Sequence, residues 1–424
     1  MQELYRIYTL GCKVNQQESE EIAAQLDSMG FSRAGKDESA DFYIINSCTV
    51  TSIADSKTRQ RIRQARKKDA DALICVIGCL PEVSNDKVIG MPEVDLTIGS
   101  SEKERTVEIV LDALKKRAKA RVARMTAHSE SARISSRTEK RTRAFIKVED
   151  GCDRFCAYCI IPYARGEVRC KPVSDVVAEA QSLIHDGYKE IVLTGINLAL
   201  YQQNSGGLND LVKRICEIDT GEEFRIRLGS LEPTVISEMD AVGLAEQKGV
   251  CPQFHLSLQS GCEKTLKAMG RHYSPADYEN IVKKLRKVDA LFSITTDVIV
   301  GFPGETDSDF EESLAFVKSI GFANVHVFKY SKRSGTIAAE MENQVPEEVK
   351  LLRSNIMSEA AAQCKFDFLE KNAGKVRRTL ILSTGKDSSK IRGLTDNGID
   401  VSLPAKSLDY RQNQFYDIAV NLGQ

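Results

Sequence analysis

Short apolar runs alternate with helix-like segments in the first quarter of the chain, and this alternation limits the fold more than any other feature. The apolar runs are YRIYTLGC (5–12), DFYIINSC (41–48) and ALICVIGC (72–79). They are rich in β-branched and aromatic residues, as buried strands are, and polar segments of helical composition (16–30 and 54–69) separate them. Strands that alternate with helices pair in parallel through crossover connections. The sequence therefore predicts a parallel-sheet α/β domain over residues 1–115.

Each of these three runs ends in a cysteine: Cys12, Cys48 and Cys79, here called the edge cysteines. Ligands of such sheets bind beyond the carboxyl ends of the strands. Three thiols that are distant in sequence are therefore expected to meet at one edge of the sheet. Three cysteines packed in the core are the structural alternative.

The bulk composition is that of an ordinary water-soluble protein, with a net charge of −1 and 28% charged residues. No apolar run approaches the ~18 residues that a membrane helix needs, and the start of the chain lacks the pattern of a signal peptide. We therefore expect a cytoplasmic protein without a membrane partner. Twelve cysteines in a reducing compartment indicate metal ligands or nucleophiles among them, with the rest as small buried residues.

The remainder of the chain divides into three segments. Residues 116–143 are basic and Ser-rich, which predicts a linker that is either solvated or in contact with RNA. Residues 144–365 contain six strand-like runs separated by helical segments, which predicts a partial (β/α)6 barrel. Residues 366–424 contain short strands with Gly and Asn-Gly turn signals, which predicts a small all-β module.

The segment GCDRFCAYCIIPYARG (151–166) carries Cys152, Cys156 and Cys159, here called the loop cysteines. It follows the first strand of the expected barrel and so lies at the mouth of that barrel, where function resides in such folds. A structural zinc ion normally takes four ligands, but no fourth cysteine or histidine is near in the sequence. Three thiolates on a four-iron cluster would leave one iron open for chemistry. A structural metal site is the alternative.

The CxxxCxxC motif after the first barrel strand resembles that of the radical S-adenosylmethionine (SAM) superfamily. The resemblance implies that the loop cysteines bind a [4Fe–4S] cluster whose open iron holds SAM, the source of a 5′-deoxyadenosyl radical. It also implies a cofactor pocket formed by the motif and by the ends of later strands. The implied pocket residues are Tyr158, Thr194, Gly195, Asn197, Ser230, Glu232, Gln259, Arg271, Asp297, Gly301, Phe328 and Tyr330. For Arg271 a surface position is the alternative to binding the carboxylate of the cofactor.

The motifs GCKVNQQESE, INSCTV and IGC, placed ahead of such a barrel, resemble those of the methylthiotransferases. This resemblance implies that the edge cysteines bind a second [4Fe–4S] cluster, which holds the sulfur to be transferred. It implies that the C-terminal module is a TRAM-like RNA-binding barrel. The expected RNA-binding residues there are Arg377, Arg378, Lys390 and Arg392. The implied partners are a tRNA anticodon stem-loop and an electron donor of unknown identity.

Within that family, GCKVNQ, CTVTSIADSKTRQ and the segment of the loop cysteines are most similar to one subgroup. Its members add a methylthio group at C2 of N6-threonylcarbamoyladenosine-37 in tRNA. Ser47, Cys170 and Ile337 depart from the usual pattern and affect the substrate assignment, but they remove no cluster ligand. The alternatives are the same chemistry on isopentenyladenosine-37 or on a ribosomal-protein aspartate. A non-catalytic metal-bound RNA-binding protein is a further one.

Overall fold

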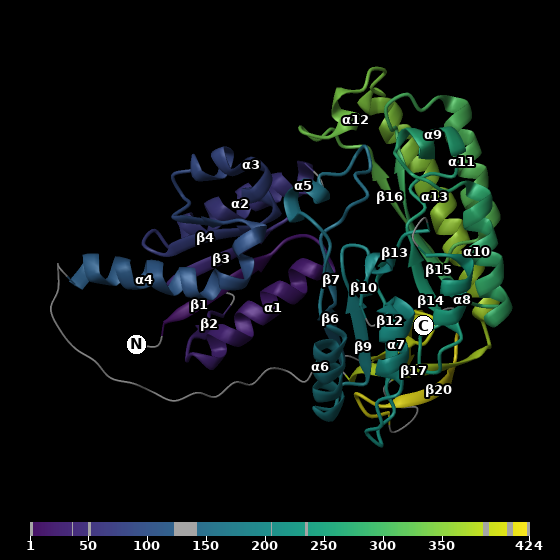
Figure 1. Cartoon of the computed structure of the whole chain (residues 1–424), viewed down its shortest axis with the longest axis horizontal. Coiled ribbons are helices and arrows are strands. Elements are labelled where there is room, and N and C mark those ends of the chain that lie inside the picture. The colour runs from purple at the N-terminus through teal and green to yellow at the C-terminus, as the bar shows by residue number, and fades with distance from the viewer. Residues whose placement is uncertain are drawn as a thin grey trace. The chain divides into compact units, whose positions relative to one another are not determined.

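The computed structural model describes residues 3–35, 37–49, 52–122, 142–204, 206–233, 236–384, 390–404 and 410–421, and most of the expected linker 116–143 lies outside these residues. The chain forms two compact units, shown in Figure 1. The N-terminal unit comprises Met1–Glu139 and Cys159–Glu167, and the barrel unit comprises Lys140–Tyr158 and Val168–Gln424. This division does not test the four segment boundaries expected from the sequence, which stay predictions.

The N-terminal unit is built on a parallel sheet of five strands in the order β2-β1-β3-β4-β5, so the predicted parallel-sheet α/β fold is confirmed. Its strands are β1 (Leu4–Thr9), β2 (Ser32–Arg33), β3 (Phe42–Ser47), β4 (Leu73–Gly78) and β5 (Leu96–Ile98). Its helices are α1 (Lys13–Ser28), α2 (Ser52–Lys68), α3 (Cys79–Ile89), η1 (Ser100–Arg105), α4 (Thr106–Val122) and α5 (Ile161–Arg165).

Helices cover both faces of this sheet, as Figure 1 shows. On one face, α1 and α4 bury Ile22, Leu26 and Val110 against the strands. On the other face, α2 and α3 bury Ile62 and Leu80. Because β3 and β4 are buried on both sides, they read in the sequence as continuous apolar runs rather than as alternating ones.

The barrel unit contains a curved set of parallel strands. They are β6 (Arg143–Lys147), β9 (Glu190–Thr194), β12 (Arg225–Leu228), β13 (Ser230–Leu231), β14 (Gln253–Leu256), β15 (Ser293–Val300) and β16 (Asn324–Lys329). Strand β9 lies between β6 and β12, and β13 to β16 follow in order. Only Gly229 separates β12 from β13, so these two short strands occupy one strand position of the barrel. The barrel then has six strand positions, and the predicted six-strand β/α arrangement is confirmed.

Helices of the barrel unit pack against these strands through a large apolar core. The helices are α6 (Val173–His185), η2 (Leu198–Leu200), α7 (Leu208–Cys216), α8 (Glu238–Ala245), α9 (Glu263–Ala268), α10 (Pro275–Val288), α11 (Asp307–Ile320), α12 (Ile337–Glu340) and α13 (Glu347–Asn372). Capping boxes fix the start of several of them. In α10, for example, Ser274 Oγ accepts from Asp277 N while the Asp277 carboxylate accepts from Ser274 N. The barrel unit also contains two short antiparallel strand pairs. They are β7 (Glu149–Asp150) with β8 (Arg169–Cys170), and β10 (Gln202–Gln203) with β11 (Gly206–Gly207).

The C-terminal segment forms an antiparallel sheet in the order β19-β18-β17-β20, which confirms the expected all-β region. The strands are β17 (Val376–Thr384), β18 (Lys390–Thr395), β19 (Asp400–Pro404) and β20 (Phe415–Ala419). The Asn397-Gly398 pair turns the chain between β18 and β19, with Gly398 at φ +85°. Its assignment as a TRAM-like barrel stays a prediction.

No helix in the described ranges combines the length with the apolar character that crossing a bilayer requires.

Candidate functional site

The edge cysteines follow three neighbouring strands of the N-terminal sheet. Cys12 comes just after β1, Cys48 directly after β3, and Cys79 directly after β4, as the first residue of α3. In this sheet all strands are parallel, but the chain adds β2 on one side of β1 and then β3 to β5 on the other, and ligands of such sheets bind at this switch point, beyond the carboxyl ends of the strands. Cys12 and Cys48 therefore flank the position where this fold places its ligands.

Strand register and two glycines bring the edge cysteines close to one another. Ser47 of β3 pairs with Gly78 of β4, so the next residues, Cys48 and Cys79, leave adjacent strands side by side. Gly11 has φ +113°, and a Cβ added there would lie 2.9 Å from Cys48 Sγ. Only glycine allows this close approach of the Cys12 loop to Cys48. The edge cysteines thus share one sheet edge, and their role as ligands stays a prediction.

The loop cysteines lie on an excursion that the β7–β8 ladder closes at its base, where Glu149 pairs with Cys170. Within this excursion Ala157 N donates to Met269 O (2.9 Å), and Ala157 O accepts from Ala338 N (2.7 Å). These bonds anchor the middle of the motif to the C-terminal end of α9 and to α12 in the barrel unit. Cys152 and Cys156 belong to the barrel unit, whereas Cys159 belongs to the N-terminal unit.

Burial makes the loop thiols weak acids in the metal-free chain. It raises the pKa of Cys152 to about 11, and the nearby charges of Glu232 and Glu149 act in the same direction. Burial likewise raises the pKa of Cys156. A metal or cluster binds thiolates, so binding here must displace protons, and affinity should increase with pH.

A single metal ion and an iron–sulfur cluster place different demands on the spacing of their thiolate ligands. Within the described residues, no three His, Cys, Asp or Glu side chains gather closely enough to hold one metal ion. The thiolate ligands of one zinc ion would each lie about 2.3 Å from it. In an iron–sulfur cluster each thiolate binds its own iron, so the sulfurs stand further apart.

A buried polar network lies at the strand ends of the barrel unit. Glu232 accepts from Asn197 Nδ2 (2.8 Å) and forms an ion pair with the Arg271 guanidinium (2.6 Å). Arg271 also donates to Tyr158 Oη (2.7 Å). Its Nε is buried and has no hydrogen-bond partner among the described residues. Such an unsatisfied donor is costly, and a bound carboxylate would satisfy it, so these residues fit the amino-acid part of SAM.

Glu149 joins this network from the strand before the cysteine loop, and sequence analysis missed it. Its Oε2 accepts from Asn197 N (2.8 Å), and a Cβ added at Gly195 would lie 2.6 Å from that oxygen. Gly195 follows Thr194, the last residue of β9, whose carbonyl accepts from Val148 N (2.9 Å). A signal was present in the sequence, since an acid directly before a cysteine loop is unusual for a buried strand end.

Three more predicted pocket residues lie along neighbouring strands. Ser230 of β13 pairs in register with His255 of β14, whose Nε2 lies 3.4 Å from the Asp297 carboxylate on β15. Gln259 N donates to Asp297 O (2.8 Å). Gln259 has φ +66°, a conformation that non-glycine residues hold only where the surroundings fix it, often at functional sites.

The last three predicted pocket residues differ in their surroundings. Tyr330 is buried beside Ala157 of the cysteine motif in a small apolar cluster. Gly301 packs against Lys350, because a Cβ added there would lie 2.4 Å from Lys350 Cγ. Phe328 is 43% exposed. In the described residues no hydrogen bond or ion pair joins Gly301 or Phe328 to the Glu232–Arg271 pair. The cofactor roles of all these residues stay predictions.

The arginines expected to bind RNA in the C-terminal sheet are paired with acids of the chain itself. Arg377 donates to Asp289 (2.7 Å), and Arg378 donates to Glu223 (2.9 Å). Arg392 lies 3.7 Å from Asp400. The side chain of Lys390 is outside the described residues. The acids thus compensate the charges of Arg377 and Arg378, whereas the long contact of the exposed Arg392 is weak, and the RNA role of these residues stays a prediction.

Comparison with known proteins agrees with this geometry. Residues 5–99 match the "Uncharacterized protein family UPF0004", and residues 146–317 match the "Radical SAM superfamily". Threonylcarbamoyladenosine tRNA methylthiotransferase MtaB of Thermotoga maritima is 39% identical, and the match covers 88% of this chain and 86% of that protein. A tRNA-2-methylthio-N(6)-dimethylallyladenosine synthase of Carboxydothermus hydrogenoformans is 33% identical, over 92% of this chain and 91% of that protein.

A solved structure shares the fold at low sequence identity. It is the radical S-adenosylmethionine methyltransferase TsrM of Kitasatospora setae, with cobalamin and a [4Fe-4S] cluster bound. The TM-score is 0.59 at 15% identity, and the match covers 80% of this chain and 77% of that one. At this identity the likeness concerns the fold alone.

Proposed function

This chain belongs to the radical-SAM tRNA methylthiotransferases, and we propose from this premise that it adds a methylthio group at C2 of N6-threonylcarbamoyladenosine-37 in tRNA. One observation above all supports this function: the chain has two sets of three cysteines, and each set lies beyond the carboxyl ends of parallel strands. The identity of 39% over most of both chains favours the threonylcarbamoyl substrate over the dimethylallyl one, for which the relative is 33% identical.

The enzyme uses SAM and [4Fe–4S] clusters, and we assign the loop cysteines to one cluster and the edge cysteines to the other. When bound, these groups supply an electron that splits SAM into methionine and a 5′-deoxyadenosyl radical, and a sulfur for transfer. Three thiolates in each set leave one iron without a protein ligand.

Side chains of the barrel unit bind and orient the cofactor in this proposal. Glu232 suits the ammonium group of SAM, and Arg271, with its unsatisfied Nε, suits the carboxylate. Asn197 and Glu149 hold the loop that follows β9, and Gly195 leaves room for that loop beside Glu149. Correct orientation matters because a primary carbon radical attacks any C–H bond that it reaches.

We further assign the anticodon stem-loop as the part of tRNA that is bound, because position 37 lies there. An electron donor must reduce the cluster of the loop cysteines. The cytoplasm, where tRNA is modified and thiols stay reduced, is the proposed location.

The assignment predicts a specific product. Anaerobically reconstituted enzyme with SAM, a reductant and tRNA that carries N6-threonylcarbamoyladenosine should yield its 2-methylthio derivative, detected by mass spectrometry of the nucleosides. The control substrate is the same tRNA transcribed without the threonylcarbamoyl group. Methylthiolation of tRNA that carries dimethylallyladenosine, in place of the threonylcarbamoyl substrate, would move the chain to the other branch. No methylthio product on any tRNA would overturn the proposed function.

A further inference from the structure

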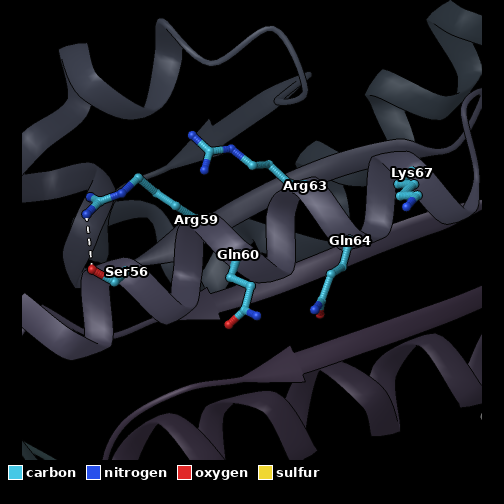
Figure 2. A pocket seen from close by; sticks show the side chains of 6 residues that line it. All are labelled: Ser56, Arg59, Gln60, Arg63, Gln64 and Lys67. Atoms are coloured by element: carbon cyan, nitrogen blue, oxygen red, sulfur yellow. Dashed lines mark hydrogen bonds between the residues drawn. The ribbon is translucent and has the colours of Figure 1, made fainter.

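Helix α2 exposes a stripe of polar and cationic side chains on the surface of the N-terminal unit. They recur at helical spacing and line an open pocket of about 330 Å³ (Figure 2). The lining residues are Ser56, Arg59, Gln60, Arg63, Gln64 and Lys67. In Figure 2 the guanidinium groups of Arg59 and Arg63 point to one side of the helix, and the amides of Gln60 and Gln64 point to the other. This set is here called the α2 face.

The charges on the α2 face have weak partners within the chain. Arg59 donates to Ser56 Oγ at 3.4 Å, and Arg63, with a side chain 67% exposed, lies 3.9 Å from Glu93. Lys67 forms no ion pair within the described residues. Arg66, by contrast, lies on another side of the same helix and donates to backbone carbonyls and to Asp95 (2.6 Å). Arg66 therefore anchors the helix, while the α2 face keeps its positive charge.

We propose that the α2 face binds the sugar-phosphate backbone of the tRNA. Arg59, Arg63 and Lys67 stand four residues apart, which spaces their attachment points about 6 Å along the helix. The two glutamines between them donate to phosphate or ribose oxygens, as such side chains do in nucleic-acid complexes. The α2 face has no aromatic side chain on which a base could stack. It therefore recognises the charge and shape of the RNA backbone rather than the base sequence.

The local charge matters because the whole chain has a net charge of only −1, so overall attraction to RNA is weak. The identity of the partner rests on the proposed function, which makes it tRNA. The contact itself rests on the α2 face alone. A binding experiment can therefore fail separately from an assay of the methylthio product.

The test is a triple variant, R59Q/R63Q/K67Q, in the full-length protein. We expect weaker tRNA binding at low salt, and a slope of log affinity against log salt that is shallower by about 2 to 3, because about three phosphate contacts are lost. Glutamine is a good helix former, so α2 should persist, and circular dichroism checks this. The measurement is fluorescence anisotropy of labelled tRNA across a salt series.

The matched control removes three cations from the surface of the barrel unit: K213Q/R214Q/K248Q. It should keep the parent slope. An unchanged slope in the α2 variant, or an equal loss in the control, would overturn the proposed contact. If the parent binds tRNA through the α2 face but forms no methylthio product, the proposed function fails while this contact stands.

A second, independent observation concerns Arg165, which lies six residues after Cys159 at the end of α5. Its side chain is 1% exposed. It donates to Asn15 Oδ1 (2.7 Å) and lies 3.1 Å from the Glu18 carboxylate. Glu18 is buried too and forms another ion pair with the buried Lys103. All four residues belong to the N-terminal unit. Burying charged groups costs free energy, and in this group the cost is offset only while the Glu18 carboxylate keeps both of its cationic partners.

Asn15 connects this ion-pair group to the edge cysteines. Its Nδ2 donates to Leu10 O (2.8 Å) and to Ser47 O (3.0 Å), and its Oδ1 lies 3.7 Å from Cys12 Sγ. Leu10 stands two residues before Cys12, and Ser47 stands directly before Cys48. One amide thus holds together the two loops that carry these cysteines, and Arg165 fixes the orientation of that amide.

We infer that Arg165 is a positioning residue for the site of the edge cysteines and acts on it through Asn15. A guanidinium donates from separate nitrogens to Asn15 and Glu18 at once, which a lysine ammonium does with much poorer geometry. Residues that hydrogen-bond to the surroundings of metal ligands in this way fix the orientation of those ligands, and they change the affinity and the redox potential of the bound metal group. The inference rests on the proposed function only in assigning a cluster to the edge cysteines.

The test uses protein in which the loop cysteines are replaced by alanine, so that any cluster present belongs to the edge cysteines. After reconstitution, Arg165→Gln should release iron to a chelator about tenfold faster than the parent, because replacing a residue of this kind typically costs 10- to 100-fold in metal affinity. Its electron paramagnetic resonance (EPR) spectrum should also differ. Arg165→Lys should lie between the two.

Two further variants separate positioning from general destabilisation. Arg169→Gln, an exposed arginine of the next segment, is the control and should match the parent. The triple variant E18Q/K103Q/R165Q removes the whole buried ion-pair group, so that neither Glu18 nor Lys103 keeps an uncompensated charge. It should still show the fast iron release, because the Asn15 contact is missing. Recovery of slow release in the triple variant, or parent-like release and EPR in Arg165→Gln, would overturn the inference.

Discussion

Replacing any one loop cysteine by alanine is expected to abolish the formation of 5′-deoxyadenosine and of the methylthio product. Replacing any one edge cysteine should abolish the methylthio product alone. The difference follows from the assignment of each set to its own cluster: Cys152, Cys156 and Cys159 hold the cluster that binds SAM, and the edge cysteines hold the sulfur donor. With three ligands per cluster, no spare thiolate replaces the lost one. Mass spectrometry of nucleosides and of 5′-deoxyadenosine in one reaction measures both outcomes.

The iron content supports the same separation. Reconstituted parent protein should hold about eight irons per chain, and a triple replacement of either set should leave about four. Cys216→Ala is the matched control, because this thiol is half-buried in α7, outside both sets, and should change neither quantity. A parent with about four irons would contradict the assignment of two clusters. An edge-cysteine variant that still forms the methylthio product would contradict the role given to that set.

The placement of the edge cysteines could be predicted from the sequence because it depends on local pattern. Apolar runs such as 41–48 and 72–79 identify buried parallel strands, and the cysteine that closes each run then lies at the carboxyl edge of the sheet. The structure adds the register between Ser47 and Gly78 and the close approach of Gly11 to Cys48. Neither follows from periodicity, since register depends on the packing of the whole sheet.

The ion-pair group around Arg165 could not be predicted, because its members are far apart in the chain. Arg165 is separated from Asn15 by 150 residues and from Glu18 by 147, and no local pattern marks these partners. The cysteines carry the resemblance of this motif to the radical-SAM superfamily, whereas nothing in the sequence marks the arginine near its end. Only the packing of Cys159–Glu167 with the N-terminal unit reveals the contact.

The same limit applies to the basic character of the C-terminal segment, whose role in RNA binding stays a prediction. Composition counts Arg377 and Arg378 as positive charges, but their acidic partners, Asp289 and Glu223, lie 88 and 155 residues away. Helix α2 shows the opposite case, since the cations of its exposed face have only weak partners within the chain. Surface charge therefore has to be judged after ion pairs are known, not from the sequence alone.

A single buried carboxylate, Glu190 of β9, organises three arginines in the barrel unit. Glu190 is fully buried and lies 2.6 Å from Arg143, 2.7 Å from Arg225 and 3.0 Å from Arg227. Two of these arginines also donate to backbone carbonyls of the C-terminal sheet. Arg225 donates to Leu394 O (2.9 Å), and Arg227 donates to Thr395 O (3.1 Å). Arg225 and Arg227 thus attach the C-terminal sheet to the barrel strands, and Glu190 neutralises the positive charge that these arginines bury.

Glu190→Gln is expected to destabilise the barrel unit by about 3–5 kcal/mol, the range found when one partner of a buried ion pair is removed. The charge of the arginines would stay buried without its counterion, although the amide keeps a similar shape. Urea unfolding of the metal-free protein, followed by circular dichroism, measures the change. The control is Glu263→Gln, an exposed acid paired with the exposed Lys267, which should leave the unfolding midpoint nearly unchanged.

The pH dependence of unfolding provides a second measure of the same charge. Burial by itself raises the pKa of Glu190, but Arg227, Arg225 and Arg143 outweigh it and hold that pKa well below the ordinary value of 4.5. A carboxyl whose pKa is depressed on folding stabilises the folded state fully above its unfolded-state pKa, and this stabilisation is lost as the pH falls toward the folded-state pKa. The parent should therefore lose stability more steeply than Glu190→Gln below about pH 4.5, since glutamine cannot titrate. If the unfolding free energies of the two proteins fall equally as the pH drops below about 4.5, Glu190 does not carry this charge in the folded state.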